Sequence, residues 1–165
     1  MRFALVALAV CVVPCVAEPP KSESGPESPP QLQGTWEVKS VERDGKTLPP
    51  GELVGRTISL TVKRRSMTLS VNGGSRTYLV DVDAGKTPSA IDFYSTSIVS
   101  IGKEQGREVR REHAGKFLDR VGIYSLDGDT LRICVAGCGT GEERPTAFVT
   151  AGKPGYELFV LTRRE

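Results

Sequence analysis

Apolar and polar residues alternate with a period of two along most of the chain after residue 30. Ile58, Leu60 and Val62 alternate with serine and threonine, and the segments 66–71 and 78–82 repeat the pattern. Because successive side chains of a β-strand point to opposite faces, this spacing predicts strands with one buried face. No stretch shows a sustained helical period, so we expect an all-β fold.

Residues that favour tight turns separate these segments. Asn72-Gly73-Gly74 tolerates the positive φ that a short hairpin turn needs. Asp44-Gly45 and Asp127-Gly128-Asp129 mark two further turns, and the last strand is expected over 157–163. The alternation and the turns together predict about eight to ten short antiparallel strands.

A set of strands of this size has to close or stack, because open edges pair with other chains. We therefore predict a single antiparallel up-and-down β-barrel. Its interior is either filled by side chains or holds one small ligand. Only 6% of the residues are aromatic, which favours a filled or narrow interior over a wide one. The residues expected to point inward are mostly aliphatic: Ile58, Leu60, Val62, Met67, Leu69, Val71, Tyr78, Val80, Ile133 and Leu161.

The first 17 residues have the layout of a secretory signal. One basic residue, Arg2, precedes an apolar run too short to span a bilayer, and Ala17 suits a signal peptidase. We expect a cleaved signal peptide over 1–17 and an exported protein in the periplasm, the cell envelope or the medium. An uncleaved anchor and a lipoprotein signal ending at Cys11 are the lesser alternatives, the second because Val10 is bulky for that cleavage site.

The next segment, 18–30, is rich in Pro, Ser and Glu and has no large apolar residue. It cannot bury enough surface to offset the entropy of ordering, so we expect a disordered linker. The β-barrel domain then covers 31–165, an ordinary size for one domain. No further apolar run is long enough for a membrane span.

Charge narrows the range of functions. The chain has 22 Lys and Arg against 20 Asp and Glu, a balance that argues against a dedicated nucleic-acid binder. The charged stretch 102–116 interrupts the strand pattern, and we interpret it as a loop that either closes the barrel mouth or hangs free. It contains the only histidine, His113, which a loop holds poorly for use as a general base.

No catalytic or metal-binding constellation stands out. Gly45-Lys46-Thr47 resembles the end of a phosphate-binding loop but lacks its first glycine and the following helix. Asp127 and Asp129 offer too few oxygen ligands for calcium. We therefore expect no cofactor and no metal.

Two cysteines, Cys134 and Cys138, remain after the signal peptide. In an oxidising compartment they can form a disulfide, although the short loop between them demands favourable Cβ directions. A bridge and two free thiols both stay open. Two cysteines and one distant histidine do not make a four-ligand zinc site.

Six stretches of the domain are distinctive in combination: LQGTWEV at 32–38, VERDG at 41–45, PSAID at 88–92, GIYSLDGDTLRIC at 122–134, ERPTAF at 143–148 and LTR at 161–163. Together they resemble a lipocalin-like family of uncharacterised exported proteins that is abundant in planctomycete bacteria. The resemblance implies a lipocalin-like barrel in an exported protein and brings no function with it. Cys138, the glycine-rich bend at 137–141 and the length of 102–116 depart from the family pattern.

True lipocalins have a Gly-x-Trp motif on the first strand, whose Trp packs beneath a basic residue near the end of the chain. Gly34-Thr35-Trp36 and Arg163 (or Arg164) resemble this pair. The resemblance implies that a guanidinium lies over the indole face and that both residues form a structural plug.

The leading functional hypothesis is a non-enzymatic module that holds a small apolar ligand or an envelope component in the barrel or at its mouth. Tyr78, Tyr124 and Arg132 are the candidate polar contacts. The alternative is a filled barrel that serves as a structural or protein-interaction domain at the cell envelope. An enzyme using Asp81 or Asp92 inside the barrel comes third, because the sequence shows no convergent pair of ionisable groups. The oligomeric state is not predicted.

Overall fold

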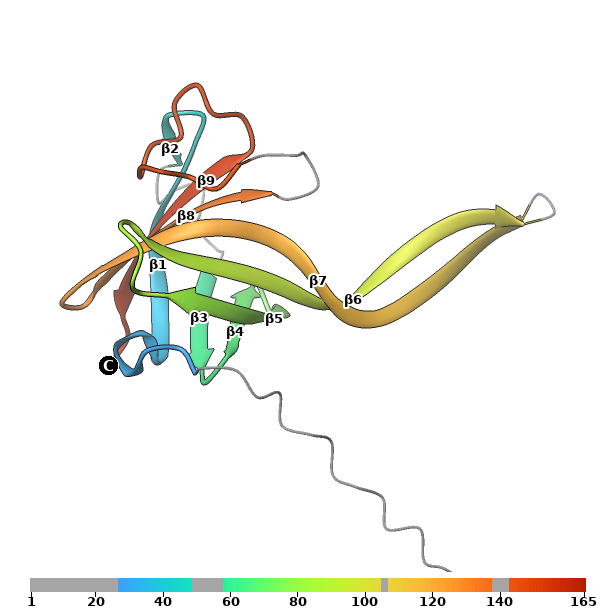
Figure 1. Cartoon of the computed structure of the whole chain (residues 1–165), viewed down its shortest axis with the longest axis horizontal. Helices are drawn as coiled ribbons and strands as arrows, with labels where there is room; N and C mark the ends of the chain where they lie inside the picture. Colours follow the sequence, from blue (N-terminus) through green and yellow to red (C-terminus); the bar gives the residue numbers. More distant parts are fainter. Residues whose placement is uncertain (1–26, 49–57, 105–106, 138–142) are drawn as a thin grey trace, which may run out of the picture.

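The computed structural model describes residues 27–48, 58–104, 107–137 and 143–165. Neighbouring strands are all antiparallel in the order β2-β1-β3-β4-β5-β6-β7-β8-β9, and β1 also pairs with β9. Eight strands therefore close into a barrel, with β2 as an extra strand beside β1 (Figure 1). The elements of this described part are η1 (Pro30–Leu32), β1 (Gly34–Arg43), β2 (Lys46–Leu48), β3 (Ile58–Lys63), β4 (Ser66–Val71), β5 (Gly74–Asp83), β6 (Ser89–Glu104), β7 (Arg107–Asp127), β8 (Thr130–Gly137) and β9 (Tyr156–Arg163).

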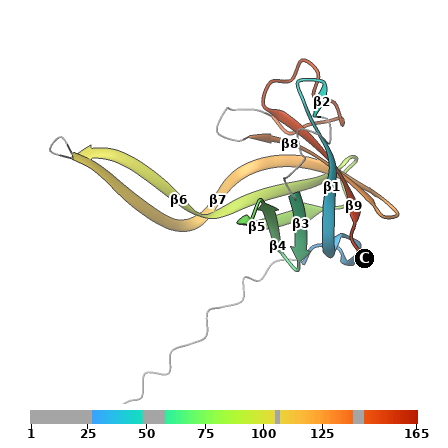
Figure 2. The same ribbon diagram turned by 180° about the vertical axis from the view of Figure 1, so that it is seen from behind.

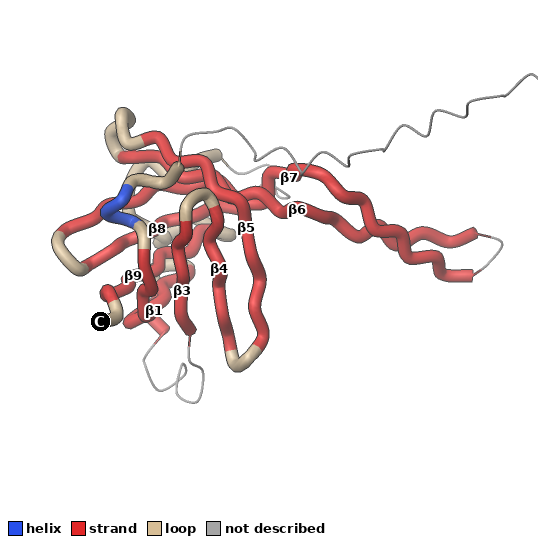
Figure 3. The backbone as a smooth tube through the Cα atoms, turned by 90° about the horizontal axis from the view of Figure 1, so that it is seen from below, coloured by secondary structure: helices blue, strands red, loops and turns tan. Residues whose placement is uncertain are grey.

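This architecture confirms the predicted antiparallel up-and-down barrel. Its strands surround one interior when the molecule is seen from below (Figure 3). Every residue expected to point inward belongs to the main core cluster, packs against it or lines the central cavity. The period-two alternation was sufficient for this prediction because one face of each barrel strand is buried.

One end of the barrel is closed by Trp36, which is fully buried. Its indole N–H donates to the Leu32 carbonyl at 2.9 Å, and the Arg163 guanidinium carbon lies 4.2 Å from the centre of the ring. Arg163 also donates to the carbonyls of Gln33 and Gln31 at 2.7 and 2.6 Å. Gly34 has a φ of +119°, and a Cβ there would lie 3.0 Å from an Arg163 nitrogen. The plug expected from the resemblance is thus present, with Arg163 in the basic position.

Part of the segment before β9 packs on the outer wall. Thr150 is buried, donates to the Glu42 carboxylate at 2.5 Å and accepts from the Gly45 N–H at 2.9 Å. Phe148 packs against a small outer cluster that contains Cys134. Cys134 is a buried free thiol. Its predicted partner, Cys138, lies outside the described residues.

Strands β6 and β7 continue past the barrel as a two-stranded arm, residues 96–104 and 107–118 (Figures 1 and 2). At its base Lys116 pairs with Asp81 at 2.8 Å and lies 4.0 Å from the Tyr94 ring centre. The interpretation of 102–116 as a loop was therefore wrong, since its described residues are strand. Both faces of the arm are exposed, so its strands lack the alternation that a buried face imposes.

Candidate functional site

The barrel encloses a cavity of about 270 Å³. A hollow of about 540 Å³ lies elsewhere, against the β3–β4 turn, but it is lined largely by polar and charged residues and is more open to solvent. The inner cavity is the better candidate because its wall is mostly apolar and enclosed by strands. Its lining residues are Val38, Arg43, Ile58, Leu60, Met67, Leu69, Val71, Tyr78, Phe93, Arg120, Ile133, Val135, Glu157, Phe159 and Leu161.

Tyr78 is the candidate contact that lies in this wall. The Tyr78 ring meets Phe93 edge to face, with 5.9 Å between the two ring centres. The Arg76 guanidinium carbon lies 5.0 Å from the centre of the Tyr78 ring. Burial raises the pKa of the Tyr78 phenol, so the group keeps its proton at neutral pH. It therefore offers a neutral hydroxyl beside apolar surface.

Two other candidates lie elsewhere. Tyr124 is buried within the core cluster and is not among the residues that line the cavity. Arg132 lies on the outer face of β8, exposed, with its guanidinium carbon 4.8 Å from the Phe148 ring centre. The alternation of β8 explains this, because Leu131 and Ile133 on either side of Arg132 point inward.

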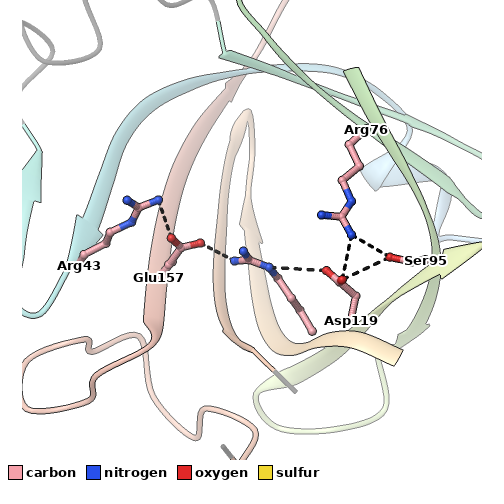
Figure 4. Close-up of polar contacts among 6 residues, drawn as sticks. Arg43, Arg76, Ser95, Asp119 and Glu157 are labelled. Atoms are coloured by element: carbon pink, nitrogen blue, oxygen red, sulfur yellow. Dashed lines mark hydrogen bonds and ion pairs between the residues drawn. The ribbon is translucent and has the colours of Figure 1, made fainter. Parts of the chain in front are cut away.

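At the end opposite Trp36, the cavity wall becomes charged. Arg43 on β1 contacts one oxygen of the Glu157 carboxylate on β9 at 2.5 Å, and Arg120 on β7 hydrogen-bonds the other (Figure 4). The Glu157 side chain is only 16% exposed, so its two guanidinium partners compensate for lost hydration. Burial alone would lower the pKa of Arg120, but the hydrogen bond to Glu157, the charge of that carboxylate and the charge of Asp119 act together with smaller contributions to raise it.

The chain of contacts continues to β5 and β6. Arg120 approaches the Asp119 carboxylate at 3.8 Å, and Arg76 donates to the other oxygen of Asp119 at 3.0 Å (Figure 4). Ser95 accepts from Arg76 at 3.0 Å and donates to Asp119 at 3.3 Å. We call Arg43, Glu157, Arg120, Asp119 and Arg76 the mouth network. It holds three guanidinium groups and two carboxylates, a surplus of one positive charge.

The sequence interpretation did not include Arg43, Arg120 or Glu157. A register shift between Val38 and Ser40 reverses the phase of β1, which turns Arg43 inward in a way that simple alternation does not predict. The inward direction of Arg120 and Glu157 could have been predicted, because each lies an even number of residues from a core residue on the same strand. Arg120 stands four residues before Tyr124, and Glu157 two before Phe159.

The carboxylates proposed for an enzyme are not inside the barrel. Asp81 alternates with the inward Val80 and pairs with Arg65 at 2.5 Å on the outer wall, and Asp92 pairs with Arg144 at 2.6 Å. Partial burial would raise the pKa of Asp81, but hydrogen bonds from Lys116 and Arg65 outweigh it and lower the pKa. The placement of both residues in the interior was therefore wrong.

His113 and metal binding add nothing to the site. His113 lies on the arm, where its Nε2 is 2.9 Å from the Ser100 hydroxyl. Among the described residues, no three His, Cys, Asp or Glu side chains gather closely enough to hold a metal. The same residues include no helix with the length and apolar character needed to cross a bilayer.

Comparisons with protein-family models, with curated proteins and with solved structures found no match to this chain.

Proposed function

We propose that the barrel binds one small amphiphilic molecule, with its apolar part in the cavity and an anionic group at the mouth network. The observation that supports this is an apolar cavity whose one charged end has more guanidinium groups than carboxylates. The protein is then a carrier or binding module and not an enzyme. The exported location and the lipocalin-like family remain predictions from the sequence.

The cavity volume limits the size of the ligand. The cavity is small, at about 270 Å³. This is near the lower limit of ordinary ligand pockets, which begin at about 300 Å³. A short acyl chain fits this volume, whereas a large flat cofactor does not.

The mouth network favours an anion over a neutral head group. Arg43 and Arg76 have side chains that are 56% and 60% exposed, so a ligand can reach them. A guanidinium binds a carboxylate through two parallel charge-assisted hydrogen bonds. The negative charge of one bound carboxylate would neutralise the surplus positive charge of the mouth network.

The test is calorimetric titration of the protein with octanoate and with 1-octanol, which share a tail and differ in charge. We expect octanoate to bind about tenfold or more tightly, because hydrogen bonds to charged groups contribute about 1.5–3 kcal/mol each. Native mass spectrometry of protein purified gently from its host, beside a denatured control, identifies any ligand carried along. If neither compound binds and no extra mass is lost on denaturation, the proposal is wrong.

Two variants locate the binding site. Arg120→Met removes a central member of the mouth network and should reduce octanoate affinity while leaving 1-octanol binding nearly unchanged. Arg132→Met removes an arginine from the outer wall and serves as the matched control. Equal losses in both variants would contradict the assignment of the anion to the mouth network.

A filled barrel that acts as an interaction domain is the second candidate. The arm favours it, since four large apolar side chains on the described part of the arm are more than 40% exposed: Ile98, Val99, Ile101 and Leu118.

A further inference from the structure

The arm has two strand edges that no other strand covers among the described residues. Strand β5 pairs with β6 only as far as Tyr94, and β8 pairs with β7 only from Arg120. Between these limits β6 and β7 pair with each other alone. An isolated two-stranded ribbon is marginally stable in water, and its edges offer unpaired backbone groups to another strand.

The two edges differ in charge. On β7 every residue from 107 to 112 except Val109 is charged, which protects that edge from pairing. On β6 the residues 96–102 contain no charge and no proline. Three of them, Ile98, Val99 and Ile101, are β-branched and 42%, 42% and 67% exposed. The β6 edge is thus the one suited to accept a further strand.

We propose that the β6 edge of the arm pairs antiparallel with the same edge of a second copy of this chain, about a twofold axis at Ser100. The two arms then form a four-stranded sheet in the order β7-β6-β6-β7. This inference is independent of the proposed ligand, because it rests on the arm and not on the cavity.

A second copy fits because the edge is complementary to itself. A twofold axis at Ser100 places Val99 opposite Ile101 of the second copy, and Ile101 opposite its Val99. Such cross-strand pairs of β-branched residues stabilise sheets.

The neighbouring register, with the axis at Val99, is weaker. It sets Ile101 against Ser97 and Ile98 against Ser100, so only one apolar pair forms across the interface. The axis at Ser100 forms two. Each copy has one arm edge with an uncharged stretch, residues 96–102, so the interface closes as a dimer and the charged β7 edges end the sheet.

Sedimentation velocity of the full chain across a concentration series tests the proposal, and a monomer–dimer equilibrium is expected. Ser100→Lys places two ammonium groups opposite each other at the axis and should weaken the dimer about tenfold or more. Ala114→Lys adds the same charge on β7 and should leave it nearly unchanged. A monomer at every concentration, or a dimer that Ser100→Lys does not weaken, overturns the proposal.

Cysteine variants test the register. With the axis at Ser100, oxidised Ser100→Cys protein should form a disulfide between the two new cysteines, mapped by mass spectrometry. Val99→Cys is the control, because its new cysteines lie diagonally across the interface, where a disulfide reaches poorly. Faster cross-linking of Val99→Cys than of Ser100→Cys overturns the register.

Discussion

The two ends of the barrel use arginine in opposite ways. At the closed end Arg163 lies over the Trp36 ring and donates to two backbone carbonyls and to Asp129. At the open end Arg43, Arg120 and Arg76 share two carboxylates. At the closed end each of the three guanidinium nitrogens of Arg163 has an acceptor in the protein. Among the described residues, the mouth network has one more guanidinium group than carboxylates. This difference fits a structural role at the closed end and the proposed binding role at the open end.

Replacing the indole should break the closed end and have the largest effect. Trp36→Ala removes a fully buried aromatic side chain and is expected to lower the free energy of unfolding by about 3–5 kcal/mol. Chemical denaturation followed by circular dichroism measures this. A loss below about 1 kcal/mol would mean that the indole is not needed to close the barrel.

Replacing the guanidinium should weaken the closed end without affecting the mouth. Arg163→Met loses the cation–π contact and the hydrogen bonds to Gln31 and Gln33, at an expected cost of about 1–3 kcal/mol in unfolding free energy. The octanoate affinity of the folded variant should stay at the wild-type value. A reduced affinity at full folding would show that the two ends are coupled.

Removing the Glu157 carboxylate should increase the difference in charge between the open end and the closed end. Glu157→Gln leaves three guanidinium groups with one carboxylate, so the surplus rises to two positive charges. We expect octanoate affinity to increase several-fold while the unfolding free energy falls by about 1–2 kcal/mol, since Arg43 and Arg120 lose an ionic partner. Calorimetry and denaturation on the same preparation measure both. A weaker affinity would mean that Glu157 orients the arginines more than it competes for them.

Salt should produce the smallest effect. The mouth arginines are partly exposed, so raising ionic strength should weaken octanoate binding by a few-fold and leave 1-octanol binding unchanged or slightly stronger. Titrations in a series of sodium chloride concentrations measure this. Equal salt dependence for both compounds would argue against an ionic contact with the head group.

Much of the fold was predictable from sequence because it depends on local patterns. Ile58, Leu60 and Val62 show their inward face through alternation alone, and the resemblance indicated the contact between Trp36 and Arg163. The mouth was harder, because its residues meet only after the barrel closes. Nothing local indicates that Arg43 and Glu157, at opposite ends of the domain sequence, become neighbours.

The arm and the outer wall show where alternation gives no guidance. The sequence of residues 102–116 has the pattern of a loop because neither face of the arm is buried. The described residues of this stretch are nevertheless strand, because β6 and β7 pair with each other. Arg132 was expected near the cavity although Leu131 and Ile133 already fix the inward parity of its strand. The first error reflects missing information, whereas the second could have been avoided by applying the pattern consistently.

The buried thiol of Cys134 provides a way to measure how often the outer wall of the barrel opens. Cys134 belongs to the buried cluster against which Phe148 packs, and burial raises its pKa to about 11, so at neutral pH the folded protein keeps the thiol protonated and unreactive. Alkylation therefore requires the covering segment to open, and its rate reports how often that happens. A thiol reagent combined with site mapping thus measures local opening of the wall separately from unfolding of the whole barrel.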